Sequence, residues 1–401
     1  MFNSLKFKVI LFGFIFTFFS SFGQSYFLGL FNSSIREALS ITHGQFGSIF
    51  ASATLCSSLL LIWVGKKIDD VNIFKFAFFV TILLSFACFF FSRITSVFLL
   101  FIGIFLMRFS GQGMMSHTAS TTISRYFTRT RGRALSISWF GLSSAEFIMP
   151  VLMVYLLTII DWQNLWLIFS ITVLIVLPIA SFLLIKNLNL DSREANDENI
   201  KEVEIKQWKR IEVIKDYRFY IISSNMLAMP WIFTGFAVFQ SFVQTSKGWG
   251  PYVIAQSFMS YSVLSVLTLF LSGFLIDKFT SRKLLIYMNI PLLLSVIVLF
   301  FFDTPVTAFV FLGLVGISNG FANILGSSTW AELYGVKYLG SIKALTTALM
   351  VFATAFGTAL FGYLIDIGFT VGDIAVVSGT YIFISLILLF FVRKKLNPII
   401  I

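Results

Sequence analysis

The chain has 401 residues, of which 58% are hydrophobic and only 12% are charged, about half of the charged fraction usual for soluble domains. Charged residues are too few to cover so apolar a chain in water, which excludes a soluble globular protein, whereas a bilayer needs no polar exterior at the depth of its hydrocarbon core. The net charge of +11 follows a membrane topology, described below, and does not indicate a nucleic-acid partner.

Twelve apolar stretches are each long enough to cross the hydrocarbon core as a helix, which takes about 20 residues. The first follows Lys6 and Lys8 and lacks a small-residue cleavage site, so it is a spanning helix and not a signal peptide. In chain order we expect spans at residues 9–31, 44–64, 73–92, 96–119, 134–158, 165–186, 219–245, 252–275, 284–302, 306–329, 342–363 and 374–392.

The spans fall into two sets of six, separated by a charged segment. The sequence predicts an all-α integral membrane protein with an N-terminal six-helix bundle (1–186), a cytoplasmic linker (187–218) and a C-terminal six-helix bundle (219–401).

The positions of Lys and Arg predict the orientation in the membrane. With the N-terminus in the cytoplasm, 25 of the 29 basic residues lie on the cytoplasmic side, three lie in outer loops, and Arg108 lies within the fourth span. An even number of spans places both ends on one side. We therefore expect a multi-pass protein of the plasma (inner) membrane with both termini in the cytoplasm.

Four landmarks recur at an offset of 208 residues, which is close to half of the chain length. They are Gly65 and Gly273, Asp69 and Asp277, Tyr126 and Tyr334, and Gly132 and Gly340. The recurrence predicts two copies of one six-helix unit, and an even number of helices gives the copies the same orientation in the membrane. In such repeats the substrate sites lie near the midplane, where the copies meet.

The loops after the second and eighth spans carry a motif that resembles the loop signature of the major facilitator superfamily, Gly-x-x-x-Asp-Arg/Lys followed by basic residues. The second copy is the fuller one, since Asp70 replaces the first basic residue in the first copy. The matching residues are Gly65 and Asp69 in the first copy, and Gly273, Asp277, Lys278 and Arg282 in the second. The resemblance implies that these loops act as conformational latches between the two halves.

The fourth span adds a further resemblance to this family. Arg108 is followed by a glycine-rich stretch up to Gly113, which is similar to the family's second signature. The resemblance covers essentially the whole chain and implies a twelve-helix secondary transporter. The tenth and eleventh helices are most similar to the monocarboxylate and oxalate/formate-like branch.

Charged residues within spanning helices are costly and usually functional, and Arg108 and Glu146 lie about midway along the fourth and fifth spans. One interpretation is that Arg108 holds an anionic group of the substrate while Glu146 takes up and releases a proton. The alternative is a static ion pair that locks helix packing, because removing one partner of a buried pair costs about 3–5 kcal/mol. A permanent pair would be neutral and would remove the preference for anions.

Helical phase, at about 100° per residue, places Gln112 close to Arg108 and His117 on the opposite face. Polar residues within lipid must face a cavity or another helix, and the alternative to a substrate contact is a hydrogen bond between helices. The family resemblance places helices one, four, seven and ten around the cavity. The candidate residues for substrate binding and proton coupling are Arg108, Glu146, Gln24, Gln112, Asn319 and Asn323.

The sequence gives no sign of a catalytic, metal or cofactor site. Cys56 and Cys88 lie in apolar runs, His43 and His117 are far apart, and no phosphate-binding glycine loop supports direct ATP drive. We expect a monomeric symporter or antiporter in the lipid bilayer that carries a small organic anion, such as a monocarboxylate, with a coupling proton.

Three alternatives stay open. Efflux of hydrophobic compounds would call for an aromatic cavity that does not use Arg108. A membrane-embedded enzyme, such as a lipid or prenyl transferase, would need carboxylates or histidines clustered near one membrane face. A sensor without transport is the third.

Overall fold

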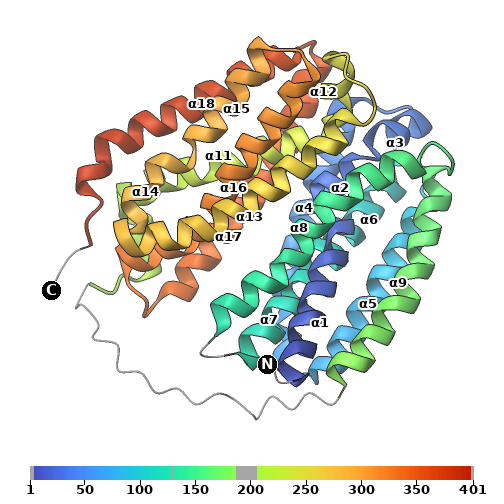
Figure 1. Cartoon of the computed structure of the whole chain (residues 1–401), viewed down its shortest axis with the longest axis horizontal. Coiled ribbons are helices and arrows are strands. Elements are labelled where there is room, and N and C mark those ends of the chain that lie inside the picture. The colour runs from blue at the N-terminus through green and yellow to red at the C-terminus, as the bar shows by residue number, and fades with distance from the viewer. Residues whose placement is uncertain (1–3, 128–129, 187–205, 399–401) are drawn as a thin grey trace. The chain divides into compact units, whose positions relative to one another are not determined.

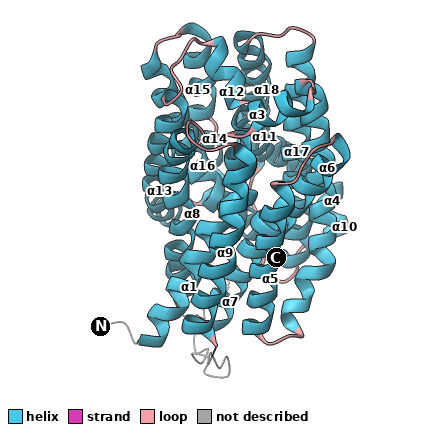
Figure 2. Cartoon of the chain, turned by 90° about the vertical axis from the view of Figure 1, so that its right-hand side faces the viewer, coloured by secondary structure: helices cyan, strands magenta, loops and turns pink. Residues whose placement is uncertain are grey.

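A computed structural model describes residues 4–127, 130–186 and 206–398 of the chain. Within these ranges every regular element is a helix (Figures 1 and 2), and twelve helical segments are long and apolar enough to cross a membrane. The predicted all-α, twelve-helix fold is confirmed. Hydropathy locates the spans because lipid admits only elements that satisfy their own backbone hydrogen bonds.

Contacts divide the chain into two compact units, Met1–Asn199 and Ile200–Ile401. The described helices of the first unit are α1 (Ser4–Ser20), η1 (Ser21–Gly23), α2 (Ser25–Gly29), α3 (Asn32–Leu39), α4 (His43–Val64), η2 (Gly65–Asp69), α5 (Ile73–Phe91), α6 (Val97–Met107), η3 (Arg108–Met115), α7 (Ser116–Tyr126), α8 (Arg131–Leu156) and α9 (Trp162–Ile185).

The described helices of the second unit are α10 (Arg210–Lys215), α11 (Tyr217–Val238), α12 (Gln240–Ser246), α13 (Val253–Phe279), α14 (Ser281–Met288), α15 (Ile290–Phe301), α16 (Pro305–Tyr334), α17 (Leu339–Asp366), α18 (Val371–Val392) and η4 (Arg393–Lys395). The fourth and tenth spans end at Tyr126 and Tyr334, several residues beyond their predicted ends. Both tyrosines are the last residue of their helix, as the 208-residue offset implies.

The two units repeat the same helix pairings. In the first unit α1 packs on α8, α4 on α6 and α5 on α9, and in the second α11 packs on α17, α13 on α16 and α15 on α18. The pair α5 and α9 is easily followed in Figure 1. The first helix of each unit thus pairs with the fifth, the second with the fourth and the third with the sixth. This agreement supports the interpretation of the chain as two parallel six-helix repeats.

The closest of these pairings are made through glycines. A Cβ atom at Gly141 of α8 would lie 2.1 Å from the carbonyl oxygen of Phe14 in α1, and one at Gly357 of α17 would lie 2.1 Å from the carbonyl oxygen of Trp231 in α11. Helices in membranes associate largely by close packing of small residues. In the first unit Thr17 adds a hydrogen bond of 2.5 Å from its Oγ1 to the carbonyl oxygen of Ser138.

The predicted linker 187–218 is described only from residue 206 onward, and this described part packs against the second unit. The backbone N–H of Trp208 donates to the carbonyl of Tyr334 at 3.0 Å, and Val213 of α10 is fully buried in that unit's core. The side chain of Trp208 is partly buried against the same core. Burial of the apolar side chains of Trp208 and Val213 explains why this part of a charged segment packs against the bundle.

Candidate functional site

The first spanning helix is interrupted in the middle of its apolar run. α1 ends at Ser20, a short 3₁₀ turn covers Ser21–Gly23, and Gln24 has extended backbone angles, φ −79° and ψ 150°, before α2 begins. Such a break leaves the last carbonyl groups of the first segment without the partners that a continuous helix supplies. In a membrane these groups need partners from other parts of the protein.

The fourth spanning helix is also irregular, at the same place as its charged residue. Residues Arg108–Met115 form a π-helical stretch between α6 and α7. π-helical turns insert an extra residue into an α-helix and are frequent at functional sites. The stretch contains Gly111 and Gly113, which have no side chains to fill the space beside the neighbouring backbone.

Two glycines bring these irregular segments into contact. A Cβ atom at Gly23 would lie 2.3 Å from the backbone nitrogen of Gln112 and 2.3 Å from the carbonyl oxygen of Met107, and one at Gly111 would lie 2.7 Å from the backbone nitrogen of Gly23. No side chain fits at these distances. The glycines therefore let the backbones of helices one and four touch where both are irregular.

Arg108 connects three helices at this contact. Its Nη1 donates to the carbonyl oxygen of Gly23 at 3.0 Å and to Ser25 Oγ at 3.2 Å, and its Nε donates to Thr54 Oγ1 at 3.1 Å. The guanidinium carbon lies 5.3 Å from the ring centre of Phe50, within the range of a cation–π interaction. The side chain thus satisfies the broken end of helix one and joins it to helix two.

All these partners of Arg108 are electrically neutral, although the residue is only 3% exposed. Its Nη2 has no hydrogen-bond partner, and its guanidinium no carboxylate partner, in the described part of the chain. A buried charge without a counter-charge is costly. The arrangement leaves Nη2 without a hydrogen-bond partner, and the charge without a counter-charge, among the described residues.

Glu146 is buried on α8, at 8% exposure. Among the described residues it forms no ion pair with Arg108, so the two membrane charges are separate in this structure. It interacts electrostatically with Tyr26 of α2, which follows the break in helix one. The static ion pair considered from the sequence is therefore not formed here.

Gln24 and Gln112 lie at the contact between helices one and four. Gln24 is the extended residue that follows Gly23, and the backbone of Gln112 touches Gly23. Both side chains are partly buried. The structure thus places Arg108, Gln24 and Gln112 in one region of the first unit.

The two candidate asparagines belong to the second unit. Asn319 donates from Nδ2 to Ser265 Oγ at 2.9 Å, which joins α16 to α13. This bond corresponds to the interhelical alternative considered from the sequence. Asn323, one helical turn further along, is exposed and is the more accessible of the two.

The loops with the family motif are held within their own units by neighbouring side chains. In the first unit His117 Nε2 donates to the carbonyl oxygen of Gly65 at 3.0 Å, and Arg125 Nη1 donates to that of Ile68 at 3.0 Å. Both satisfy carbonyl groups at the C-terminal end of helix two, where the positive charge of Arg125 is also favourable. The side chain of Asp69 lies outside the described residues.

In the second unit, Arg282 makes the main contacts of the loop that carries the second copy of the family motif. Its Nε lies 2.9 Å from Glu332 Oε1, and its Nη1 donates to Asn397 Oδ1 at 2.9 Å. Glu332 also accepts from the backbone N–H of Ser281 at 2.9 Å, which caps the start of α14. Gly273 lies within α13 and Lys278 is exposed, while the side chain of Asp277 lies outside the described residues.

Four residues of the site were not identified from the sequence. Gly23 and Ser25 flank the break in helix one, Thr54 lies on α4, and Tyr26 of α2 interacts electrostatically with Glu146. The run Gly23–Ser25 contains a glycine, an amide and a hydroxyl within an apolar helix, and this cluster is a usable signal for a break.

Comparisons with known proteins agree with the fold. The family model of the Major Facilitator Superfamily matches residues 13–257, more than half of the chain. The crystal structure of a bacterial homologue of the human lysosomal transporter Spinster, inward-facing and unoccupied, superposes with a TM-score of 0.76 at 13% identity, covering 98% of each chain. The nucleoside transporter NupG gives a TM-score of 0.69 at 15% identity, covering 98% of each chain. Curated protein sequences give no significant match.

The twelve spanning helices, the repeated helix pairings and the match over residues 13–257 lead to one conclusion. The chain belongs to the Major Facilitator Superfamily and is a membrane transporter, not an enzyme.

Proposed function

We propose that the protein is a monomeric secondary transporter of the plasma membrane that carries a small organic anion, preferably a monocarboxylate, by alternating access coupled to protons. The observation that carries this proposal is that Arg108 is a buried cation whose described hydrogen-bond partners are all neutral and whose Nη2 has no described partner. A carboxylate at this edge would supply the missing negative charge through charge-assisted hydrogen bonds.

Glu146 is the proposed coupling group. Its carboxyl is buried close to Tyr26 and has no ion pair with Arg108 among the described residues. Because a membrane charge without a partner is costly, the charge state of Glu146 depends on its surroundings. A change in those surroundings during transport would then take up or release a proton.

The distribution of basic residues supports an orientation with both termini in the cytoplasm. Gln24, Gln112, Asn319 and Asn323 are proposed as further substrate contacts, with Asn319 the weaker candidate because Ser265 already binds it. The loops at Gly65 and Arg282 are proposed as the conformational latches that the family resemblance implies.

The test is uptake of labelled monocarboxylates into proteoliposomes under an imposed pH gradient. The proposal expects uptake by the wild type, near-background uptake by Arg108→Ala, and uptake by Glu146→Gln that no longer responds to the gradient. Uptake that persists unchanged in both variants would refute the proposed site. Uptake of an active substrate that ignores collapse of the gradient in the wild type would refute proton coupling alone.

A further inference from the structure

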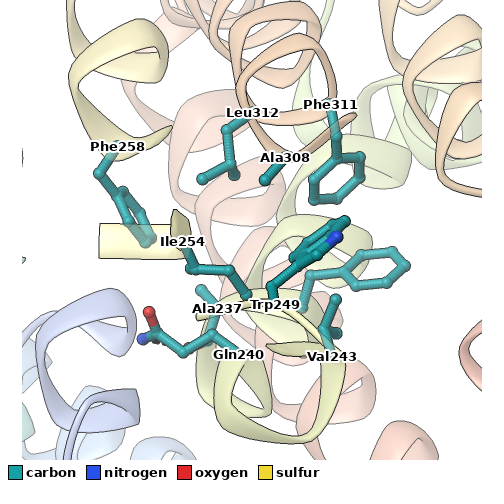
Figure 3. A pocket seen from close by; sticks show the side chains of 10 residues that line it. Ala237, Gln240, Val243, Trp249, Ile254, Phe258, Ala308, Phe311 and Leu312 are labelled. Carbon is teal, nitrogen blue, oxygen red and sulfur yellow. Dashed lines mark hydrogen bonds between the residues drawn. The ribbon is translucent and has the colours of Figure 1, made fainter. Parts of the chain in front are cut away.

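The pocket drawn in Figure 3 lies inside the second unit and is lined mainly by apolar side chains of α11, α12, α13 and α16. Between these side chains there is room for about one water molecule, so no organic ligand fits there. The surface of each unit carries a stronger sign of a ligand, at one end of its third and sixth spans.

In the first unit the third and sixth spans, α5 and α9, lie side by side (Figure 1) and carry lysines at the same end. Lys75 lies in the first turn of α5, and Lys186 directly follows α9. The rings of Phe74 and Phe182 are 6.4 Å apart, which brings the start of α5 beside the end of α9. The Nζ of Lys186 lies 4.1 Å from the ring centre of Phe182. Two exposed cations therefore lie at the end of one helix pair, next to two aromatic rings.

The second unit repeats this set of residues at the offset of 208 residues. The corresponding pairs are Lys75 and Lys283, Phe182 and Phe390, and Lys186 and Lys394. Lys283 lies in the first turn of α14, which begins the ninth span, and Lys394 follows α18, the last span. The rest of the ninth span, α15, packs on α18. The same residues thus lie at the same positions of equivalent helix pairs in both units.

Exposed apolar side chains continue from the lysines along each span. Phe79 follows Lys75 by one helical turn and is 52% exposed, and Tyr287 follows Lys283 by one turn and is 55% exposed. Lysine side chains at such positions extend their charged ends towards the membrane surface. A span that is apolar along its length and cationic at its end matches a phospholipid, which has apolar tails and an anionic phosphate.

The charges of these lysines are not neutralised by carboxylates in the described part of the chain. The helices α5, α9, α14 and α15 contain no Asp or Glu. Asp70 precedes α5 and pairs with Lys67, and Glu332 pairs with Arg282. None of the four lysines forms an ion pair with a described residue. Each helix pair therefore offers two positive charges to an anion at the membrane surface.

We propose that the end of each of these two helix pairs binds the phosphate group of an anionic phospholipid, such as phosphatidylglycerol, through its two lysines. The orientation proposed above places both ends at the cytoplasmic leaflet, whose anionic lipids attract basic residues. Each lysine near this surface strengthens binding about fivefold. The two sites lie on the lipid-facing surface and do not involve the buried Arg108.

The test is native mass spectrometry of the full-length protein titrated with phosphatidylglycerol, with zwitterionic phosphatidylcholine for comparison. In the first unit Lys75→Gln/Lys186→Gln removes both charges of the site. Lys66→Gln/Lys67→Gln is the matched control, because it removes two exposed charges from the same unit at another helix end. We expect affinity for phosphatidylglycerol at the first-unit site to fall at least tenfold in the first variant and to stay unchanged in the control.

The second unit provides an independent repeat of this test. Lys283→Gln/Lys394→Gln should weaken the second site at least tenfold, and Lys337→Gln/Lys343→Gln, which removes two exposed charges elsewhere in the unit, should not. The fourfold variant that combines both site variants should bind phosphatidylglycerol no better than phosphatidylcholine.

Two further measurements distinguish a lipid site from a general effect of charge. Lys75→Arg/Lys186→Arg keeps both charges and should keep wild-type affinity. Excess inorganic phosphate should not displace the lipid, because the tails as well as the phosphate contact the protein. Equal wild-type affinity for the two lipids, equal losses in site variants and controls, or displacement by inorganic phosphate would overturn the proposal.

Discussion

Arg108 donates from Nη1 to the carbonyl oxygen of Gly23 at 3.0 Å, across the contact between helices four and one. The carbonyl belongs to the broken end of helix one, and the donor lies about midway along the fourth span. The Nε and Nη1 atoms of the guanidinium thus join helices one, two and four, whereas Nη2 has no described partner. This division predicts that structural and ligand-binding roles of Arg108 can be separated.

The structural role is tested by changing its neutral partners. Thr54→Val removes the acceptor for Nε, and Ser25→Ala removes one of the two acceptors for Nη1. Each variant should lower stability by about 1–3 kcal/mol, since a hydrogen bond to a charged group is lost. Melting temperature in detergent is the measurement, and transport per folded molecule should fall less than in Arg108→Lys, which cannot reproduce the planar fork. Equal transport losses in all three variants would mean that Arg108 acts only through packing.

Proton coupling is tested at Glu146 and its neighbour. Glu146→Gln keeps the shape of the side chain but cannot change charge, so uptake should become independent of external pH. Tyr26→Phe should shift the pH profile of uptake without abolishing it, because it removes a phenol group that is electrostatically coupled to Glu146 but keeps the ring. A Glu146→Gln variant with the wild-type pH profile would exclude this residue as the coupling group.

Helix packing through glycine is tested by Gly141→Ala and Gly357→Ala. The added Cβ atoms would meet backbone oxygens at 2.1 Å, and overpacking costs about 1–3 kcal/mol. Gly132→Ala and Gly340→Ala are matched controls, because a Cβ atom there meets nothing within 4 Å. The first two variants should melt at lower temperature than their controls, and equal melting temperatures within each pair would contradict the close approach.

The contacts at the start of α14 are tested by Glu332→Gln. The change removes the charge that pairs with Arg282 at 2.9 Å and weakens the cap on Ser281, so amide exchange in the first turn of α14 should accelerate. Asp70→Asn is the control, because its pair with Lys67 spans 3.9 Å and is exposed, and exposed pairs contribute little. Unchanged exchange in Glu332→Gln would show that the ion pair is not needed there.

The twelve spans could be predicted because apolar length is a strong signal, whereas the π-helical stretch within the fourth span was not predicted. Helical phase, at a constant angle of about 100° per residue, places His117 on the helix face opposite Arg108. This prediction is wrong. His117 bonds to Gly65 and Arg108 bonds to Thr54, so both side chains face helix two. The extra residue of the π-helical stretch between them rotates the rest of the helix.

The repeat offset shows a similar limit. The 208-residue offset correctly relates Tyr126 to Tyr334 at the ends of their helices. The close glycine contacts, however, are at Gly141 and Gly357, which are 216 residues apart. A single offset therefore does not relate every helix of one unit to its copy, because packing is set by where small residues fall on each helix.

The most direct test of the central claim is equilibrium binding of a labelled monocarboxylate and of its neutral amide to the purified protein. Wild type and Thr54→Val are expected to prefer the carboxylate by about 10- to 100-fold, as a charge-assisted hydrogen bond is worth about 1.5–3 kcal/mol. Folded Arg108→Ala should lose that preference and bind both ligands equally weakly. If Arg108→Ala instead keeps the wild-type preference for the carboxylate, the guanidinium is not the anion site.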